Sequence, residues 1–312
     1  MIERNKDWHI TPVSRQLKIL ILGAAGQVGR ELQRGFSTAG EVIACDRSQA
    51  DLANPEQLRS IVRNGAPDVI LNAAAYTAVD RAESEREAAF AINAHAPRVL
   101  AEEARDRNAL LVHYSTDYVF DGAKESFWLE TDQPNPLNVY GASKLAGEQA
   151  IAEVGGKYLI FRTTWVYGPH GKNFLLTMLR LGRERDRLTI VNDQIGAPTT
   201  SIAIADATRS VVDRAVDEGV LAEGGRDWAG IYNMTCSGST TWCGFGREIF
   251  ARAGSHLAKT PEVVPIASKD YPTPAARPRN SVLSNEKLAA RFGVRLPAWQ
   301  AALDTALAQL RA

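Results

Sequence analysis

The chain has 312 residues, with 36 Lys and Arg against 36 Asp and Glu, so that its formal net charge is zero. With an isoelectric point of about 7.0, the chain has no electrostatic reason to bind nucleic acid or an anionic membrane, and a small soluble ligand is the better expectation. The three cysteines form no Cys-x-x-Cys pair, and no apolar run approaches the ~20 residues of a membrane-spanning helix; this argues against a disulfide framework, a zinc site and a membrane anchor, and favours the cytoplasm.

From Leu17 onward, short apolar runs alternate with longer amphipathic stretches. The apolar runs lack strict alternation, which is typical of strands buried on both faces in a parallel sheet between layers of helices. Between them, segments such as residues 84–107 carry an apolar stripe at helical spacing. The pattern predicts an α/β fold with a doubly wound parallel sheet, whose first strands are Leu17–Leu22, Glu41–Cys45, Asp68–Asn72, Leu110–Ser115 and Lys157–Thr163.

After Gly168 the alternation of apolar runs and amphipathic stretches becomes less regular. Prolines are frequent at residues 260–278, and because proline blocks helix interiors and central strands, we expect extended loops there. Residues 296–311 return to an amphipathic helical pattern. We therefore predict an N-terminal extension (1–16), a Rossmann-type domain (17–170) and a smaller, mostly helical, substrate-binding lobe (171–312), with part of residues 187–235 returning to the first domain.

A glycine-rich turn follows the first expected strand and opens the first helix. Its pattern is G-x-x-G-x-x-G, formed by Gly23, Gly26 and Gly29 around Gln27 and Val28. A backbone that turns this sharply beside a diphosphate needs residues without side-chain bulk, and the helix N-terminus offers amides to the phosphates. The turn therefore indicates a dinucleotide cofactor.

The residues after the second strand bear on which dinucleotide is used. Asp46 can bind the adenosine ribose diol, as in NAD-dependent enzymes, whereas the adjacent Arg47 can bind the 2′-phosphate of NADP. Both NADH and NADPH therefore remain possible. Further cofactor contacts are expected at other strand ends, where open α/β sheets bind ligands, from Asp51, Leu52, Ala73, Ala74 and Ala75.

Tyr140 and Lys144 stand four residues apart in a YxxxK pattern, which places a phenol and an ammonium on one helix face. Reduction of a carbonyl needs a proton donor, and a nearby cation lowers the pKa of a tyrosine toward working pH. Thr116, at the end of the fourth strand, offers a hydroxyl to the same oxygen. The three residues are the predicted catalytic set.

Several longer motifs resemble one enzyme family. They are GAAGQVG, NAAAYTAVDRAE, HYSTDYVFDG, PLNVYGASKLAGE, FRTTWVYG, NDQIGAPT and PTPAARPRNSVL. Together they are similar to the dTDP-4-dehydrorhamnose reductases, extended short-chain dehydrogenases that reduce the 4-keto group of a nucleotide-activated deoxysugar. The resemblance runs from about residue 18 to about residue 300, and it implies a cytoplasmic role in making dTDP-L-rhamnose for cell-surface polysaccharide.

The resemblance also implies roles for individual residues. It supports the catalytic set and places Thr116, Asp117 and Trp165 against the deoxysugar. Its cofactor residues match Gly26, Gln27, Val28, Asp46, Asp51, Leu52, Ala75 and Thr77, with Tyr114 nearby. Some members are metal-linked dimers that use acidic residues at the first helix, where Glu31 stands, so a homodimer and Mg²⁺ are further expectations.

Polar residues of the C-terminal half complete the expected substrate site. Asn173 and Gln194 lie on loops suited to contact the nucleotide sugar, and Arg277 or Arg279 is a candidate for its diphosphate. The five histidines are scattered without an HxxxH or HExxH pair, and we assign them no catalytic or metal-binding role. Two other functions stay open on this fold: a nucleotide-sugar epimerase or dehydratase with tightly bound NAD, and a non-catalytic, NADP-binding regulatory subunit.

Overall fold

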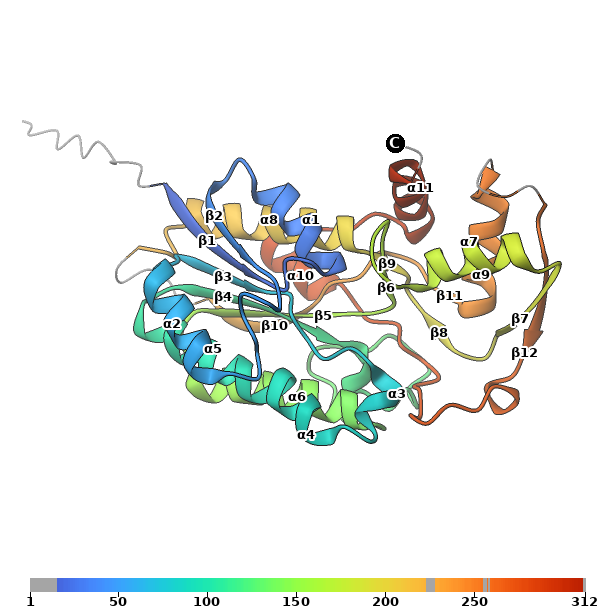
Figure 1. Cartoon of the computed structure of the whole chain (residues 1–312), viewed down its shortest axis with the longest axis horizontal. Helices are drawn as coiled ribbons and strands as arrows, with labels where there is room; N and C mark the ends of the chain where they lie inside the picture. The colour runs from blue at the N-terminus through green and yellow to red at the C-terminus, as the bar shows by residue number, and fades with distance from the viewer. Residues whose placement is uncertain (1–15, 223–227, 255–256, 258, 311–312) are drawn as a thin grey trace, which may run out of the picture.

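The computed structural model describes residues 16–222, 228–254, 257 and 259–310; apart from residue 16, the expected N-terminal extension lies outside this part. A six-stranded sheet forms the centre, in the order β10-β5-β4-β3-β1-β2 (Figure 1), and every pairing in it is parallel. This confirms the predicted α/β fold. The strands are β1 (Leu17–Leu22), β2 (Gly40–Cys45), β3 (Val69–Asn72), β4 (Leu110–Thr116), β5 (Tyr158–Thr163) and β10 (Ala229–Asn233).

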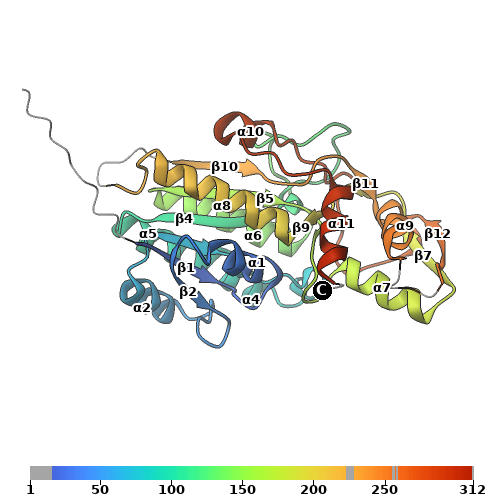
Figure 2. The same cartoon turned by 90° about the horizontal axis from the view of Figure 1, so that it is seen from above.

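Helices cover both faces of the sheet (Figure 2). Along β1, Ile19 and Ile21 belong to one hydrophobic core and Leu20 and Leu22 to the other. Because both faces of β1 are buried from Ile19 to Leu22, the sequence there shows a continuous apolar run and not an alternation. One layer consists of α1 (Gln27–Phe36) and α8 (Ser201–Asp217), and the other of α2 (Pro55–Gly65), α5 (Ala96–Asp106) and α6 (Val139–Val154).

The strand order places a topological switch point beside β1. Its neighbours are β2 on one side and β3 on the other, so the chain moves away from β1 in opposite directions. In parallel sheets the carboxyl ends of the strands meet at one edge, and ligands bind where the order reverses. The motifs that follow β1, β3, β4 and β5 therefore meet at this edge.

The helical stretch expected at residues 84–107 is interrupted. The stretch consists of α4 (Arg86–Phe90), a π-helical turn (Ala91–His95) and α5. A short helix, α3 (Val79–Ala82), precedes it. A π-helical turn inserts an extra residue into a helix and is frequent at functional sites. Here it contains Asn93, which contacts the site described below.

The C-terminal lobe lies beyond the carboxyl edge of the sheet, on the right in Figure 1. Segments that follow residue 170 also belong to the sheet domain: α8 packs on α1, and β10 pairs with β5. The domain boundary at residue 170 stays a prediction. The remaining elements are β6 (Val166–Tyr167), α7 (Phe174–Glu184), β7 (Arg187–Val191), β8 (Ile195–Gly196), β9 (Thr199–Thr200), β11 (Thr240–Thr241), α9 (Trp242–Arg252), β12 (Glu262–Ile266), α10 (Glu286–Phe292) and α11 (Trp299–Gln309).

Two expectations for the C-terminal half are wrong in detail. Residues 262–266 form β12, which pairs in parallel with β7, whereas we expected extended loops there. Pro265 is tolerated because a strand of a two-stranded sheet has a free edge, where a missing N–H breaks no pairing. The last helix begins at Trp299 and not at residue 296, since Pro297 lies just before it.

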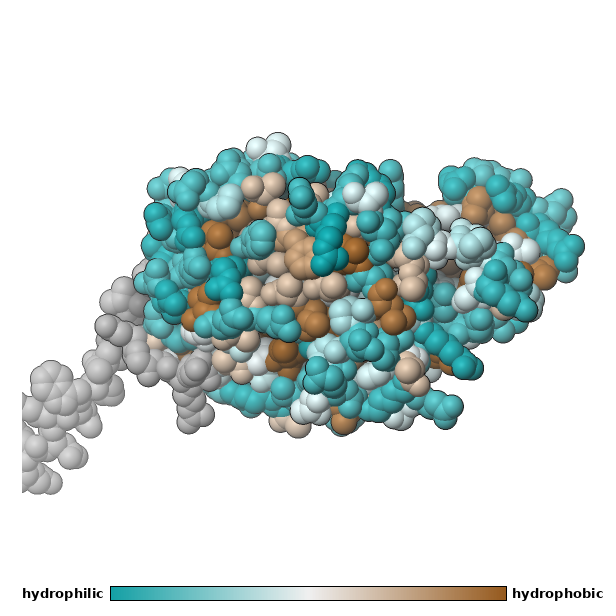
Figure 3. All heavy atoms as spheres, turned by 90° about the horizontal axis from the view of Figure 1, so that it is seen from below, coloured by the Kyte–Doolittle hydropathy of each residue, from teal (hydrophilic) through white to brown (hydrophobic). Residues whose placement is uncertain are grey.

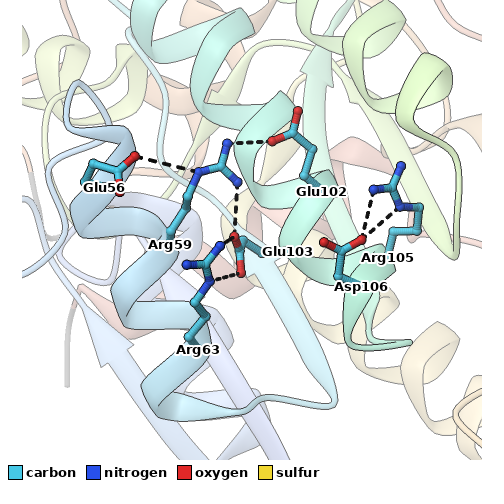
Figure 4. A network of polar contacts seen from close by, with 7 residues as sticks. All are labelled: Glu56, Arg59, Arg63, Glu102, Glu103, Arg105 and Asp106. Atoms are coloured by element: carbon cyan, nitrogen blue, oxygen red, sulfur yellow. Dashed lines mark hydrogen bonds and ion pairs between the residues drawn. The ribbon is translucent and has the colours of Figure 1, made fainter.

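Helices α2 and α5 are joined by an ion-pair network (Figure 4). The carboxylate of Glu103 is only 3% exposed and accepts hydrogen bonds from Arg59 and Arg63. Burial opposes ionisation of Glu103, but the two guanidinium groups outweigh it and lower its pKa. The outward face of these helices mixes hydrophilic side chains with hydrophobic patches (Figure 3). Within the described residues, no helix is long and apolar enough to span a membrane.

A fully buried ion pair joins α6 to β5. Arg162 and Glu148 are each 2% exposed or less, and their side chains form two parallel hydrogen bonds of 2.9 and 2.6 Å. The guanidinium also lies 5.0 Å from the centre of the Phe120 ring. Removing one partner of such a pair leaves an uncompensated charge in the interior.

We expect Glu148→Gln to lower the free energy of unfolding by about 3 kcal/mol or more, because it leaves the buried charge of Arg162 without a counter-charge. Glu153→Gln is the matched control, since it makes the same chemical change on the same helix at an exposed ion pair with Arg98. The control should change the free energy by less than about 0.5 kcal/mol. Urea unfolding followed by circular dichroism measures both, and equal values would contradict the proposed importance of the buried pair.

Candidate active site

The glycine-rich turn packs directly on the loop that follows β3. Gly23 has a φ of +78°, and a Cβ placed on it would lie 2.7 Å from the Ala74 nitrogen. A Cβ on Gly29 would lie 2.1 Å from the Gly23 carbonyl oxygen. Among the described residues no side chain caps α1 at Gly26, so the amides of its first turn, which include those of Gln27 and Val28, are available to an anion.

Asn173 holds this turn from the side of the C-terminal lobe. Its amide nitrogen donates to the Gln27 side-chain oxygen at 2.8 Å and to the Gly168 carbonyl at 2.9 Å, while its side-chain oxygen caps α7 by accepting from the Leu176 amide. Both ends of the Asn173 amide are therefore engaged within the protein. The structure gives Asn173 a role in positioning Gln27, and its predicted contact with substrate would have to replace these bonds.

Asp46 and Arg47 follow β2 at the same edge. One carboxylate oxygen of Asp46 accepts hydrogen bonds from the Ser48 hydroxyl (2.6 Å) and amide (2.8 Å), which lower the pKa of Asp46. Arg47 is exposed and forms no hydrogen bond or ion pair with any residue that the structure describes. Asp51 accepts from the Ala53 amide at 3.0 Å, and Leu52 is buried.

Asn93 fixes the loop that carries Ala73, Ala74, Ala75 and Thr77. Its side chain accepts from the Tyr76 amide (2.8 Å) and donates to the Tyr76 carbonyl and to the Ser143 hydroxyl, each at 3.0 Å. The loop after β3 is thereby tied to α6. Sequence reasoning missed this residue, because only the fold brings the π-helical turn against both segments.

Thr116, Asp117 and Tyr140 lie together where β4 ends and α6 begins. The Thr116 hydroxyl donates to Asp117 at 3.2 Å. Burial raises the pKa of Tyr140 to about 12, and the adjacent Thr116 hydroxyl opposes the shift. The expected lowering of the Tyr140 pKa is therefore wrong for this structure, since burial dominates. A phenol with this pKa holds its proton at neutral pH.

Lys144 is the innermost group of the predicted catalytic set. Its side chain is 1% exposed, and its ammonium donates to the Tyr114 carbonyl oxygen at 2.5 Å and lies 3.1 Å from the His113 Nε2 atom. Burial lowers the pKa of Lys144 to about 8, and Glu148, one helical turn further along α6, opposes the shift. Close to neutral pH, Lys144 is thus a largely protonated cation.

Asp117 is a buried carboxyl beside the phenol. Burial raises its pKa to about 6, although the nearby hydroxyls of Ser281, Thr116 and Thr164 oppose this. Its second oxygen, Oδ2, has no hydrogen-bond partner among the described residues. By contrast, the side chain of Tyr114 lies in the hydrophobic core, with its hydroxyl 2.9 Å from that of Thr208. The Tyr114 carbonyl oxygen, in contrast, accepts the hydrogen bond from Lys144.

Trp165 follows β5 in a left-handed backbone conformation with a φ of +47°, which is unusual for a bulky residue. Its indole stacks on that of Trp242, with ring centres 3.7 Å apart and planes 11° apart. On Gly196, a Cβ would lie 2.5 Å from the Trp165 ring. Backbone strain of this kind concentrates at ligand sites, and the stack adds Trp242 to the candidate residues.

Two other candidates of the C-terminal half, Gln194 and Arg277, form hydrogen bonds within the protein. Gln194 donates to the Ser268 hydroxyl at 2.9 Å. Arg277 forms a two-pronged ion pair with Asp80, at 2.8 and 3.1 Å, which ties its loop to α3. Arg279 lies near Asp193, whose pKa is lowered despite its partial burial.

Glu31 does not stand in a metal centre in this structure. It is 2% exposed and accepts a hydrogen bond from Arg34 at 2.8 Å. Across the described ranges, no group of three or more His, Cys, Asp or Glu side chains could hold a metal ion. Nothing in the site therefore supports the expected Mg²⁺.

Unused polar atoms collect at the carboxyl edge. The side-chain oxygens of Ser115, Thr163 and Thr164 are buried without a hydrogen-bond partner among the described residues. Ser115 and Thr163 lie at the carboxyl ends of β4 and β5, and Thr164 directly follows β5, at the same edge as the glycine-rich turn. Buried polar atoms normally have partners, so hydroxyl-rich ligand groups suit this edge. The residues present thus fit a dinucleotide with its diphosphate at α1.

Comparison with known proteins agrees with this arrangement. The family model for the RmlD substrate binding domain matches residues 17–312. A dTDP-4-dehydrorhamnose reductase of Burkholderia thailandensis is 50% identical over 298 residues, which cover 94% of this chain and 99% of that protein. The Escherichia coli K12 protein of the same name is 45% identical over 301 residues, with coverage of 94% and 98%. The crystal structure of a Bacillus anthracis dTDP-4-dehydrorhamnose reductase in complex with NADP superposes with a TM-score of 0.86 at 34% identity, covering 95% of this chain and all of that one.

The turn itself can be tested with two alanine substitutions in α1. Gly29→Ala places a methyl group against the Gly23 carbonyl, so it should weaken NADPH binding at least about tenfold and destabilise the fold by about 2 kcal/mol. Gly35→Ala meets no atom within 4 Å and should be neutral or stabilising by up to about 1 kcal/mol. NADPH fluorescence titration and thermal unfolding check both variants. Unchanged binding in Gly29→Ala would remove the turn from the cofactor site.

Proposed function

This chain belongs to the dTDP-4-dehydrorhamnose reductase family, and we propose that it reduces the 4-keto group of dTDP-4-dehydro-L-rhamnose to give dTDP-L-rhamnose. Family membership makes it an NAD(P)H-dependent oxidoreductase of rhamnose biosynthesis. The observation that carries the proposal is the meeting of Thr116, Tyr140 and Lys144 at the edge where the glycine-rich turn offers a cofactor site.

Proton delivery falls to Tyr140. A nicotinamide nucleotide, when bound, supplies the hydride that reduces C4. The Tyr140 phenol, whose pKa of about 12 keeps it protonated, donates its proton to the 4-oxygen. With the sugar bound, the Thr116 hydroxyl would turn from Asp117 to the same oxygen, donate its hydrogen bond there and stabilise the developing negative charge. The Lys144 cation stabilises the phenolate left behind.

The predicted cofactor residues that follow each strand would contact a different part of the dinucleotide. Gly23, Gly26, Gln27, Val28 and Gly29 would hold the diphosphate at the N-terminus of α1. Asp46 or Arg47, together with Asp51 and Leu52, would contact the adenosine end, where the free guanidinium of Arg47 suits a 2′-phosphate. The loop of Ala73, Ala74, Ala75 and Thr77 would lie against the nicotinamide end, with the Lys144 ammonium donating to its ribose.

The sugar would lie between Tyr140 and the C-terminal lobe. Asp117 Oδ2, buried without a partner among the described residues, would accept a hydrogen bond from a sugar hydroxyl. The stacked indoles of Trp165 and Trp242 offer an apolar surface to the methyl group of a 6-deoxysugar. Gln194 directly precedes β8 and would release Ser268 to reach the nucleotide.

An absorbance assay at the nicotinamide band tests the function. With NADPH and dTDP-4-dehydrorhamnose, the proposal requires net NADPH oxidation and formation of dTDP-rhamnose. Isomerisation of the sugar without net oxidation would indicate an epimerase. Binding without any reaction would indicate a regulatory subunit.

Tyr140→Phe removes the proton donor while keeping the ring, so turnover should fall about 100-fold or more with substrate affinity largely kept. Tyr232→Phe is the control, because Tyr232 lies on the edge strand β10 and packs against Phe292, away from the site. Steady-state kinetics compare the two. Full activity of Tyr140→Phe would exclude Tyr140 as the donor.

The choice of cofactor can be tested at Arg47. We expect the wild-type protein to use both NADH and NADPH. Arg47→Ala should lower kcat/KM for NADPH about tenfold, through loss of a charge-assisted contact to the 2′-phosphate, and leave the value for NADH within about twofold. The two cofactors are compared under identical conditions. Equal losses would show that Arg47 does not reach the 2′ position.

A further inference from the structure

His113 is a buried titratable group to which neither the sequence nor the proposed mechanism assigns a role. It lies on β4 and is 1% exposed. Its Nε2 atom is 3.1 Å from the Lys144 ammonium, and its Nδ1 atom is 3.0 Å from the Asn72 amide nitrogen. A histidine in direct contact with a buried catalytic cation calls for a physical account.

The charges around this contact show which form the imidazole takes. Lys144 faces His113 from α6, and Glu148 on the same helix is neutralised by its ion pair with Arg162 of β5. Asn72, the contact from β3, is uncharged. Burial and the Lys144 charge together lower the pKa of His113 well below its ordinary value. The imidazole is therefore neutral, with one N–H and one acceptor nitrogen.

The ammonium then decides the position of the imidazole proton. An ammonium only donates, so Nε2 must accept from Lys144 and the proton must stand on Nδ1. Nδ1–H in turn needs an acceptor. Asn72 Oδ1 is buried without a partner among the described residues, and a half-turn of its amide, which exchanges oxygen and nitrogen, places it against Nδ1. One chain of donors then runs from Lys144 through His113 to Asn72.

We propose that His113 is a positioning residue for Lys144, holding the ammonium by its Nε2 atom so that one N–H remains directed to the carboxyl edge of the sheet. The Tyr114 carbonyl takes a second N–H, and three donors are all that an ammonium has. Asn72 acts through His113 by selecting its tautomer. This inference rests on the proposed role of Lys144 in the reductase reaction.

The tautomer can be measured without cofactor or substrate. Nitrogen-15 NMR of histidine-labelled protein distinguishes Nδ1–H from Nε2–H imidazole, and the His113 signals are those missing from His113→Gln. We expect a neutral Nδ1–H tautomer from pH 5 to 7, where Lys144 is a protonated ammonium, and a gain of Nε2–H tautomer in Lys144→Met, where no ammonium requires an acceptor. An Nε2–H tautomer in the wild-type protein would overturn the proposal.

Two substitutions of similar length separate positioning from packing. Glutamine at position 113 can still accept from the ammonium through Oε1, whereas methionine cannot. His113→Met should lower kcat about tenfold with little change in KM for the sugar, and should move the alkaline limb of the kcat–pH profile about one unit lower, because an ammonium without its acceptor has a lower pKa. His113→Gln should keep kcat within about threefold and leave that limb in place.

The outcomes distinguish this inference from the function on which it rests. Equal losses in both variants without a shift of the alkaline limb would mean that His113 only fills space, and would overturn the positioning role. If the wild-type protein failed to oxidise NADPH with dTDP-4-dehydrorhamnose, the proposed function would fail, while the NMR result would still decide the His113–Lys144 contact. Circular dichroism and NADPH titration establish that each variant is folded and binds cofactor.

Discussion

Lys144 brings a positive charge into the interior between α6 and the sheet, where a charge persists only if polar groups surround it. The sheet supplies the Tyr114 carbonyl and His113, and α6 supplies Glu148, whose own charge is balanced by Arg162. These contacts leave the helix little freedom to slide or rotate against β4 and β5. Tyr140 stands one turn before Lys144 on the same helix face. The contacts that stabilise the lysine charge therefore also fix the position of the Tyr140 phenol at the carboxyl edge.

The central sheet could be predicted because each of its strands is recognisable from a short stretch of sequence. A strand covered on both faces appears as an unbroken apolar run, and the predicted bounds of Leu17–Leu22 agree with the observed ones. Strand β12 could not be found in this way, since its existence depends on pairing with β7, which lies much earlier in the chain. The π-helical turn at Ala91–His95 was also missed, because one inserted residue scarcely disturbs an apolar stripe.

The site residues also fall into those that a local pattern predicts and those that only the fold reveals. Gly23, Gly29, Tyr140 and Lys144 form short spaced patterns whose chemistry follows from residue type and spacing alone. The partners of these residues cannot be inferred in that way, since Asn72, Asn93 and His113 reach them only through the fold. The sign of the Tyr140 pKa shift was misjudged for a related reason: spacing reveals a lysine four residues away but not the depth to which the phenol is buried, and burial raises the Tyr140 pKa. Asn173 also caps a helix in this structure, a role that its loop position did not reveal, and its contact with substrate stays a prediction.

The stacked indoles of Trp165 and Trp242 come from two different elements, one directly after β5 of the central sheet and the other from the first turn of α9 in the lobe. Two aromatic chromophores in van der Waals contact couple their electronic transitions. Such a pair gives a near-ultraviolet circular dichroism signal and an emission yield that depend steeply on its separation. The circular dichroism signal and the emission of this pair therefore report the separation of the two indoles, and so of the sheet and the lobe, without any attached label.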